Sequence, residues 1–138
     1  MRVRKQKTGE GECIDVSLLD ATLASMAAWV ISNYLNAGAV PKPMGNENHT
    51  AAPSGTYRCG SGQLNIVNNE EHQVHSLCEV VGHPEWKTDP RFAERHTRIG
   101  NRETLRSLLE EALSAKTAAE WEPLFTQAGV PIGPVLNV

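Results

Sequence analysis

One long apolar helix constrains the fold more than any other feature of the sequence. Between Asp15 and Gly38 the chain reads DVSLLDATLASMAAWVISNYLNAG, in which apolar residues recur at steps of three and four, the spacing of one helical face. Asp15 or Ser17 can cap the first free amides, and Gly38 is a typical terminator. The sequence therefore predicts a helix over about residues 16–37. Its main apolar face carries Val16, Leu19, Leu23, Met26, Val30 and Tyr34.

Further apolar residues lie off this face, namely Leu18, Ala28, Trp29 and Leu35. A helix that is apolar on more than one side must bury more than one side. Its most apolar stretch, residues 21–31, is about half of the ~20 residues that cross a bilayer. We therefore expect a buried helix and no membrane span.

Composition excludes several classes of protein. With 138 residues, 40% of them apolar, and a net charge of −3, the chain is expected to be globular. A pI near 5.9 argues against nucleic-acid binding. The three cysteines have no paired spacing, which favours a reducing cytoplasm. No long apolar segment directly follows the basic cluster of Arg2, Arg4, Lys5 and Lys7, so we expect no signal peptide.

The rest of the chain predicts a small α+β domain. A loop rich in proline and glycine spans residues 37–55, and strand-like runs at 56–59 and 64–67 flank a hairpin turn. Helices are expected over 71–81, over 102–114 with Asn101 as cap, and from Thr117, where Glu120 completes a capping box. We expect residues 83–101 to be a polar connector anchored by Trp86 and Phe92. The predicted architecture is a linker segment, 1–54, with the long helix, then a domain, 55–138, with a short antiparallel sheet and three helices.

Two motifs resemble ligand sites but lack the required spacing. Lys7, Thr8, Gly9 and Gly11 suggest a phosphate loop, yet no lysine followed by serine or threonine comes after the glycines. We interpret this stretch as a glycine turn. His72, His75 and Cys78 follow one another at steps of three on a predicted helix, without the paired spacing of a zinc site. We favour exposed histidines beside a buried cysteine, and predict no metal.

The residues alone do not indicate a catalytic group either. Cys59 and His49 could form a nucleophile and its base, but nothing in the sequence brings them together, and a buried thiol is the commoner role. Asp15 and Asp20 do not share a helical face. Glu110 and Glu111 are typical of a solvated face. We predict no catalytic residue in this chain.

Several segments in order do carry a resemblance. These are KTGEGECIDVSLLDA, the Gly45–Asn46 loop up to Pro53, DPRF at 89–92, Asn101–Arg102 with Leu105 and Leu109, and the closing WEPLFTQAGVPIGPV. Together they resemble CoA-transferase family III, which includes formyl-CoA and carnitine-CoA transferases and the related α-methylacyl-CoA racemases. The resemblance runs over nearly the whole chain and is to the linker helix and small domain of that family.

The resemblance implies CoA transfer between carboxylic acids through an acyl-aspartyl anhydride, with coenzyme A as substrate and no other cofactor. It also implies that the catalytic aspartate lies upstream of the matched part, so that Asp15 and Asp20 do not inherit its role. Most of the CoA site is then absent, and we expect the chain to be inactive alone. One functional segment carries over, a lid that closes over the anhydride, at Gly45, Asn46, Glu47, Asn48 and His49. The run of consecutive glycines of formyl-CoA transferase is missing from it.

The long helix then has a reason to be apolar on several sides. In the family it packs against the large domain, and two chains interlock. We expect self-association, first as a dimer. A further candidate partner is a chain that supplies the large CoA-binding domain, whereas neither nucleic acid nor membrane is an expected partner. The contacts would come from Leu19, Leu23, Met26, Val30 and Tyr34. Two alternatives stay open: a non-catalytic self-associating or acyl-CoA-binding module, and a fragment of a racemase.

Overall fold

The computed structural model describes residues 6–11, 13–38, 40 and 42–136, and only the backbone of Ala28 and Trp29. Arg2, Arg4 and Lys5 of the basic cluster lie outside the described residues, as do the side chains of Ala28 and Trp29. The chain divides into two compact units, Met1–Pro43 and Met44–Val138. The boundary between the units falls inside the loop of residues 37–55, so that its part from Met44 onward belongs to the second unit.

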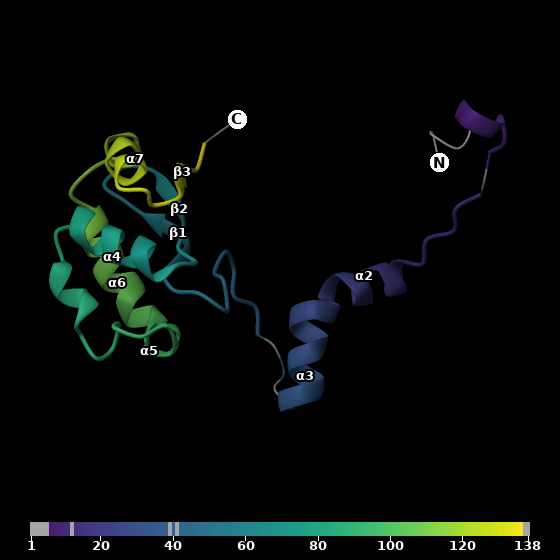
Figure 1. Cartoon of the computed structure of the whole chain (residues 1–138), viewed down its shortest axis with the longest axis horizontal. Coiled ribbons are helices and arrows are strands. Elements are labelled where there is room, and N and C mark those ends of the chain that lie inside the picture. Colours follow the sequence, from purple (N-terminus) through teal and green to yellow (C-terminus); the bar gives the residue numbers. More distant parts are fainter. Residues whose placement is uncertain (1–5, 12, 39, 41, 137–138) are drawn as a thin grey trace. The chain divides into compact units, whose positions relative to one another are not determined.

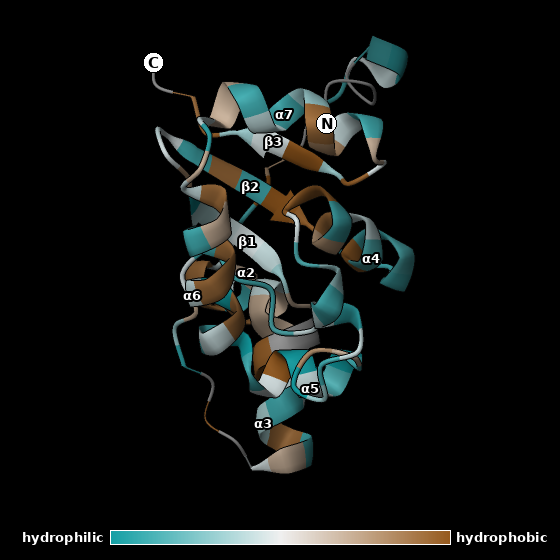
Figure 2. Cartoon of the chain, turned by 90° about the vertical axis from the view of Figure 1, so that its left-hand side faces the viewer, coloured by the Kyte–Doolittle hydropathy of each residue, from teal (hydrophilic) through white to brown (hydrophobic). Residues whose placement is uncertain are grey.

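The first unit contains the long helix, built from three consecutive segments. They are α2 (Leu18–Met26), a π-helical turn η1 (Ala27–Ile31) and α3 (Ser32–Ala37). Ser17 caps the start, because its hydroxyl oxygen accepts a hydrogen bond from the amide of Asp20 at 3.2 Å. Gly38 ends the helix in the left-handed conformation at φ 65°. Figure 2 shows both hydrophobic and hydrophilic residues along α3, and none of the described residues of α2 and α3 is buried.

The second unit has a three-stranded antiparallel sheet in the order β1 (Ser54–Arg58), β2 (Gln63–Val67), β3 (Ile132–Pro134). Along β2 the buried residues alternate with exposed ones, as a half-buried strand requires. Leu64 and Ile66 face the helices and are fully buried. The opposite face of β2 is open to solvent. The predicted α+β class with a short antiparallel sheet is thus confirmed.

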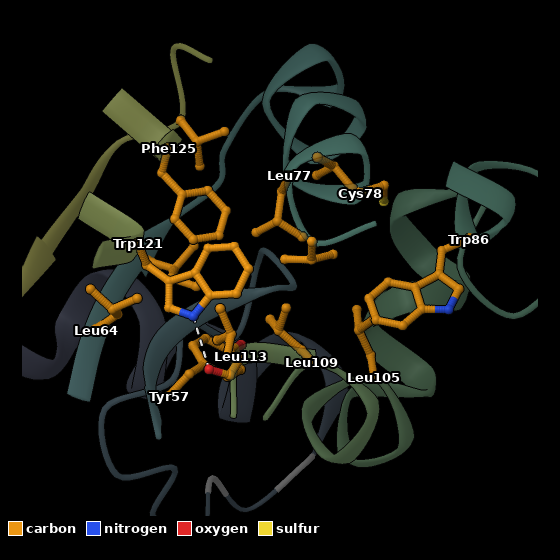
Figure 3. Close-up of a cluster of buried hydrophobic side chains, with 14 of the residues drawn as sticks. Tyr57, Leu64, Leu77, Cys78, Trp86, Leu105, Leu109, Leu113, Trp121 and Phe125 are labelled. Carbon is orange, nitrogen blue, oxygen red and sulfur yellow. Dashed lines mark hydrogen bonds between the residues drawn. The ribbon is translucent and has the colours of Figure 1, made fainter. Parts of the chain in front are cut away.

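Helices cover the buried face of the sheet. In chain order they are α4 (Glu71–Val80), the 3₁₀ turn η2 (Pro84–Lys87), α5 (Arg95–Gly100), α6 (Arg102–Leu113) and α7 (Ala118–Gln127). In Figure 1 α4, α6 and α7 gather beside the sheet. Figure 3 shows the core between them, where aromatic and leucine side chains point toward one another. Its fully buried members include Leu64, Leu77, Leu109, Leu113 and Phe125.

Besides the cap at Ser17, two further helix caps are predicted, and they differ in outcome. Thr117 and Glu120 form the predicted capping box, with the Glu120 carboxylate 2.8 Å from the Thr117 amide. Asn101 occupies the cap position of α6, but its side chain makes no cap bond there. It instead donates to the carbonyl of Thr97 at 2.9 Å, so it closes the end of α5.

The segment expected as a polar connector folds into η2 and α5. Trp86 and Phe92 are buried, as predicted for its anchors. Helix α5 has no typical start signal in the sequence, because glutamate is not among the preferred cap residues. In the structure Glu94 and Thr97 form a reciprocal capping box at its start.

Candidate functional site

The predicted lid loop begins with a tight turn at Gly45. Gly45 has φ 61°, which a residue with a side chain rarely adopts, and a Cβ atom there would meet nothing within 4 Å. The amide of Glu47 donates to the carbonyl of Met44 at 3.2 Å and closes the turn. Gly45 and Asn46 are exposed, whereas burial begins at Glu47. The loop therefore has an exposed tip and a half-buried base.

The base of the loop packs against the first strand. The amide of Asn48 donates to the carbonyl of Ser54 at 3.1 Å. The Asn48 side-chain oxygen accepts from the amide and the hydroxyl of Thr50, at 2.9 and 2.8 Å. At Gly55 a Cβ atom would lie 3.0 Å from the carbonyl oxygen of Asn46, so this close approach requires glycine.

Two arginines of α6 bind the Glu47 carboxylate. Arg106 Nε lies 2.6 Å and its Nη2 2.5 Å from Glu47 Oε1, while Arg102 Nη1 lies 3.3 Å from Oε2. Arg102 also donates to the carbonyl of Asn48 at 3.2 Å. Glu47 is 15% exposed, and charge-assisted bonds in such a setting are among the stronger ones. Both carboxylate oxygens of Glu47 are thus bound by arginines of the same chain.

The ion pairs continue from Arg106 along the edge of the sheet. Glu110 accepts from Arg106 Nη1 at 3.1 Å and from Arg58 Nη2 at 3.0 Å. The Arg106 guanidinium lies 4.5 Å from the centre of the Tyr57 ring. Burial raises the pKa of Tyr57 to about 12, although the charge of Arg106 acts against this shift. Tyr57 therefore stays a neutral phenol that packs under the cation.

Two further groups singled out in the sequence are the cluster of His72, His75 and Cys78 and the thiol of Cys59. The described residues contain no group of three or more histidine, cysteine or acidic side chains that could hold a metal ion. Burial raises the pKa of Cys78 to about 11, and burial also raises the pKa of Cys59, whose thiol donates to the carbonyl of Ser61. A reactive cysteine needs a lowered pKa, so neither thiol is a prepared nucleophile.

Near the start of the chain, the described part of the predicted glycine turn contains a left-handed glycine and a local hydrogen bond. Gly9 has φ 74°, and the amide of Glu10 bonds back to the hydroxyl of Thr8 at 3.3 Å. Glu12 lies outside the described residues.

Sequence reasoning missed Arg106 and misplaced Glu110. Glu110 was expected on a solvated face, but its side chain is only 16% exposed and pairs with Arg58 and Arg106. A signal was present in the four-residue spacing of Arg98, Arg102 and Arg106. That spacing puts Arg102 and Arg106 on one face of α6, while Arg98 lies in the preceding helix α5. It does not by itself say what they bind.

The residues proposed for self-association are largely open to solvent. Leu19 is 68% exposed and Tyr34 52%, while Val30 is half-buried. Leu23 and Met26 are exposed as well. Within the described part of the chain, no helix has both the length and the apolar character needed to cross a bilayer.

Comparison with known proteins identifies the relatives of this chain. The sequence model of CoA-transferase family III matches residues 1–138. The chain is 38% identical over 134 residues to acetyl-CoA:oxalate CoA-transferase of Acetobacter aceti, covering 97% of this chain and 34% of that protein. It is 27% identical over 136 residues to human succinyl-CoA:glutarate CoA-transferase, covering 99% and 31%. The chain thus spans about a third of the length of these relatives.

Solved structures show the same similarity. A CAIB/BAIF family protein from Brucella suis matches with a TM-score of 0.74 and 32% identity, over 99% of this chain and 36% of that one. Rv3272 from Mycobacterium tuberculosis matches with a TM-score of 0.73 and 25% identity, over 99% and 34%. The likeness therefore extends along the whole chain and covers a part of each larger protein.

Proposed function

Because the chain belongs to CoA-transferase family III, we propose that it forms the linker helix and small domain of an enzyme that moves coenzyme A between carboxylic acids. The observation that carries this proposal is the 38% identity to acetyl-CoA:oxalate CoA-transferase along 97% of the chain. We take short carboxylic acids as the substrate class, with oxalate as the acceptor to test first.

In this proposal the chain does not catalyse transfer alone. The CoA site and the nucleophilic aspartate would lie in the two thirds of the relatives that this chain does not match. The candidate site supports this division, because its carboxylate Glu47 is held by Arg102 and Arg106. A paired carboxylate of that kind is a poor nucleophile. The free thiols of Cys13, Cys59 and Cys78 fit a cytoplasmic enzyme.

We assign the loop Gly45–His49 the role of a lid over the acyl intermediate. Its exposed tip at Gly45 and Asn46 can move, and φ 61° at Gly45 gives the turn its shape. A lid that excludes water protects an anhydride from hydrolysis. A substitution at Gly45 should therefore raise hydrolysis of acyl-CoA relative to transfer.

A chimera tests the proposal directly. The segment of the Acetobacter aceti enzyme that matches this chain would be replaced by residues 1–138, and transfer of CoA from acetyl-CoA to oxalate would be measured. We expect the chimera to be active, and both the isolated chain and the enzyme without the segment to be inactive. Gly45→Ala in the chimera should increase the ratio of hydrolysis to transfer, with Gly133→Ala as control. Activity of the chain alone, or a folded chimera without activity, would contradict the proposal.

We also propose that the helix of residues 18–37 binds a second copy of the chain. It carries exposed apolar side chains on more than one side, including Leu18, Leu19 and Leu35, and such patches usually mark interfaces. Light scattering and sedimentation should reveal a dimer or higher assembly at tens of micromolar. Leu19→Glu with Leu23→Glu should weaken it, whereas Leu124→Glu, an exposed leucine of α7, should not. A strict monomer would refute this idea.

A further inference from the structure

Three arginines at four-residue spacing bind the segment that follows the lid tip. Arg98 lies in α5, and Arg102 and Arg106 lie in α6. Each donates to a backbone carbonyl of residues 48–56: Arg98 to Ala52, Arg102 to Asn48 and Arg106 to Thr56. These three carbonyls come from a loop and an edge strand, where backbone acceptors otherwise depend on water.

Arg98 is the most deeply buried of the three, at 3% exposure. Its Nε donates to the carbonyl of Ala52 at 3.0 Å, and Nη1 donates to the carbonyl of Phe92 at 2.8 Å. Nη2 pairs with the carboxylate of Glu71 at 2.5 Å. The guanidinium thus joins the end of the loop to two other parts of the domain. Lysine could not reproduce this fork of donors.

Arg102 and Arg106 bind residues at both ends of the same segment, with most of their bonds at its beginning. Both bind Glu47, and Arg106 also reaches the carbonyl of Thr56 at 2.9 Å. Along the loop, Gly45 and Asn46 are exposed, and Glu47 is the first half-buried residue. Among the described residues, no arginine forms a hydrogen bond or ion pair with Gly45 or Asn46, which precede it. The contacts therefore divide the five-residue lid into a free tip and a held base.

We propose that Arg98, Arg102 and Arg106 are positioning residues for the lid, and that Glu47 is its anchor. Gly45 and Asn46 are the moving part, and Glu47 does not face the substrate. Holding the base limits the conformations that the tip must search before it closes. The catalytic meaning of this inference rests on the proposed lid function, but the anchoring itself can be measured on the chain alone.

Hydrogen exchange followed by mass spectrometry on the full chain tests the anchoring. The variants are Arg102→Lys, Arg106→Lys and the milder Glu47→Gln, which keeps the size of the side chain and removes its charge. We expect amide exchange in residues 47–52 to become about tenfold faster in the lysine variants, with exchange in α4 and α7 unchanged. Arg91→Lys is the matched control, since it disrupts the exposed pair with Asp89 and does not touch the loop.

Two results would overturn the proposal. One is loop exchange that stays at the wild-type rate in all three variants. The other is equal acceleration in the loop, α4 and α7, which would mean that the arginines only stabilise the whole domain. If a lysine variant does not fold, amide exchange in Glu47→Gln is compared with the wild type in the loop, α4 and α7 in the same way. An inactive chimera would refute the lid function and leave the exchange result unaffected.

Discussion

The indole N–H of Trp121 donates a hydrogen bond to the carbonyl oxygen of Leu113 at 2.8 Å (Figure 3). Leu113 is the last residue of α6, and Trp121 is the fourth residue of α7. The same carbonyl, which lies at a helix end, also accepts from the amides of Gly60 at 3.3 Å and Lys116 at 3.4 Å. The indole bond therefore ties the end of one core helix to the body of the next.

Trp121→Phe should destabilise the chain by about 2–4 kcal/mol, because it removes this buried bond and leaves a cavity. The free energy of unfolding from urea titration measures the effect. Trp86→Phe is the matched control, since Trp86 is also buried and its indole N–H makes no hydrogen bond among the described residues. If the two variants lose equal amounts of unfolding free energy, the loss comes from the smaller side chain alone and the Trp121–Leu113 hydrogen bond does not contribute.

Gly60→Ala should destabilise the hairpin where it meets the end of α6. A Cβ atom at Gly60 would lie 2.6 Å from the carbonyl oxygen of Ser114 and 2.9 Å from that of Lys116. Both obstacles are backbone, so the turn must move, at a cost of about 1–3 kcal/mol. Gly100→Ala is the control, since a Cβ there meets nothing within 4 Å. Thermal unfolding should show a lower Tm for the first variant, and an unchanged or higher Tm for the second.

Glu110 should make stability depend on pH in the acid range. Burial alone would raise its pKa, but bonds from the Arg58 amide and guanidinium and the charge of Arg106 outweigh burial, so the pKa lies below its ordinary value of 4.5. A lowered folded pKa gives stability that is full above 4.5 and is lost as pH falls through the folded value. Glu110→Gln should therefore lower the Tm at pH 7 and flatten its decline below pH 4.5.

The neighbouring Glu111→Gln is the control for this pH dependence, because Glu111 is exposed and takes no part in the pairs of Arg58 and Arg106 described above. Its Tm profile should follow the wild type. If Glu110→Gln also follows the wild type between pH 3 and pH 7, the ion pairs do not contribute to stability, as is common for exposed pairs.

The sequence predicted those elements whose signals are local. The spacing of Leu105, Leu109 and Leu113 marks the buried face of α6, and Thr117 with Glu120 marks the start of α7. The long helix was equally visible, since Ser17 and Gly38 bound a periodic apolar run. Each of these signals lies within a few residues of the feature that it predicts.

The candidate site depends on contacts between distant parts of the chain. Glu47 and Arg106 are 59 residues apart in sequence, and Arg58 and Glu110 are 52 apart. Charged residues on a helix are typical of a solvated face, so nothing local distinguishes Glu110, which pairs, from Glu111, which is exposed. Only the fold brings β1, the loop and α6 together. The family resemblance predicts a lid at this loop, but it does not predict the arginines that bind Glu47.

Asn68 provides the last prediction, because it is buried without a partner. The residue follows β2 and is 2% exposed, and neither its side-chain oxygen nor its nitrogen has a hydrogen-bond partner among the described residues. An unsatisfied buried amide costs free energy that an apolar side chain of similar size does not. Asn68→Leu should therefore raise the free energy of unfolding by about 1–2 kcal/mol, measured by urea titration. Asn65→Leu, on the exposed face of β2, should change it by less than about 0.5 kcal/mol. Destabilisation of the Asn68 variant would instead mean that the amide binds a buried water molecule, which leucine cannot hold.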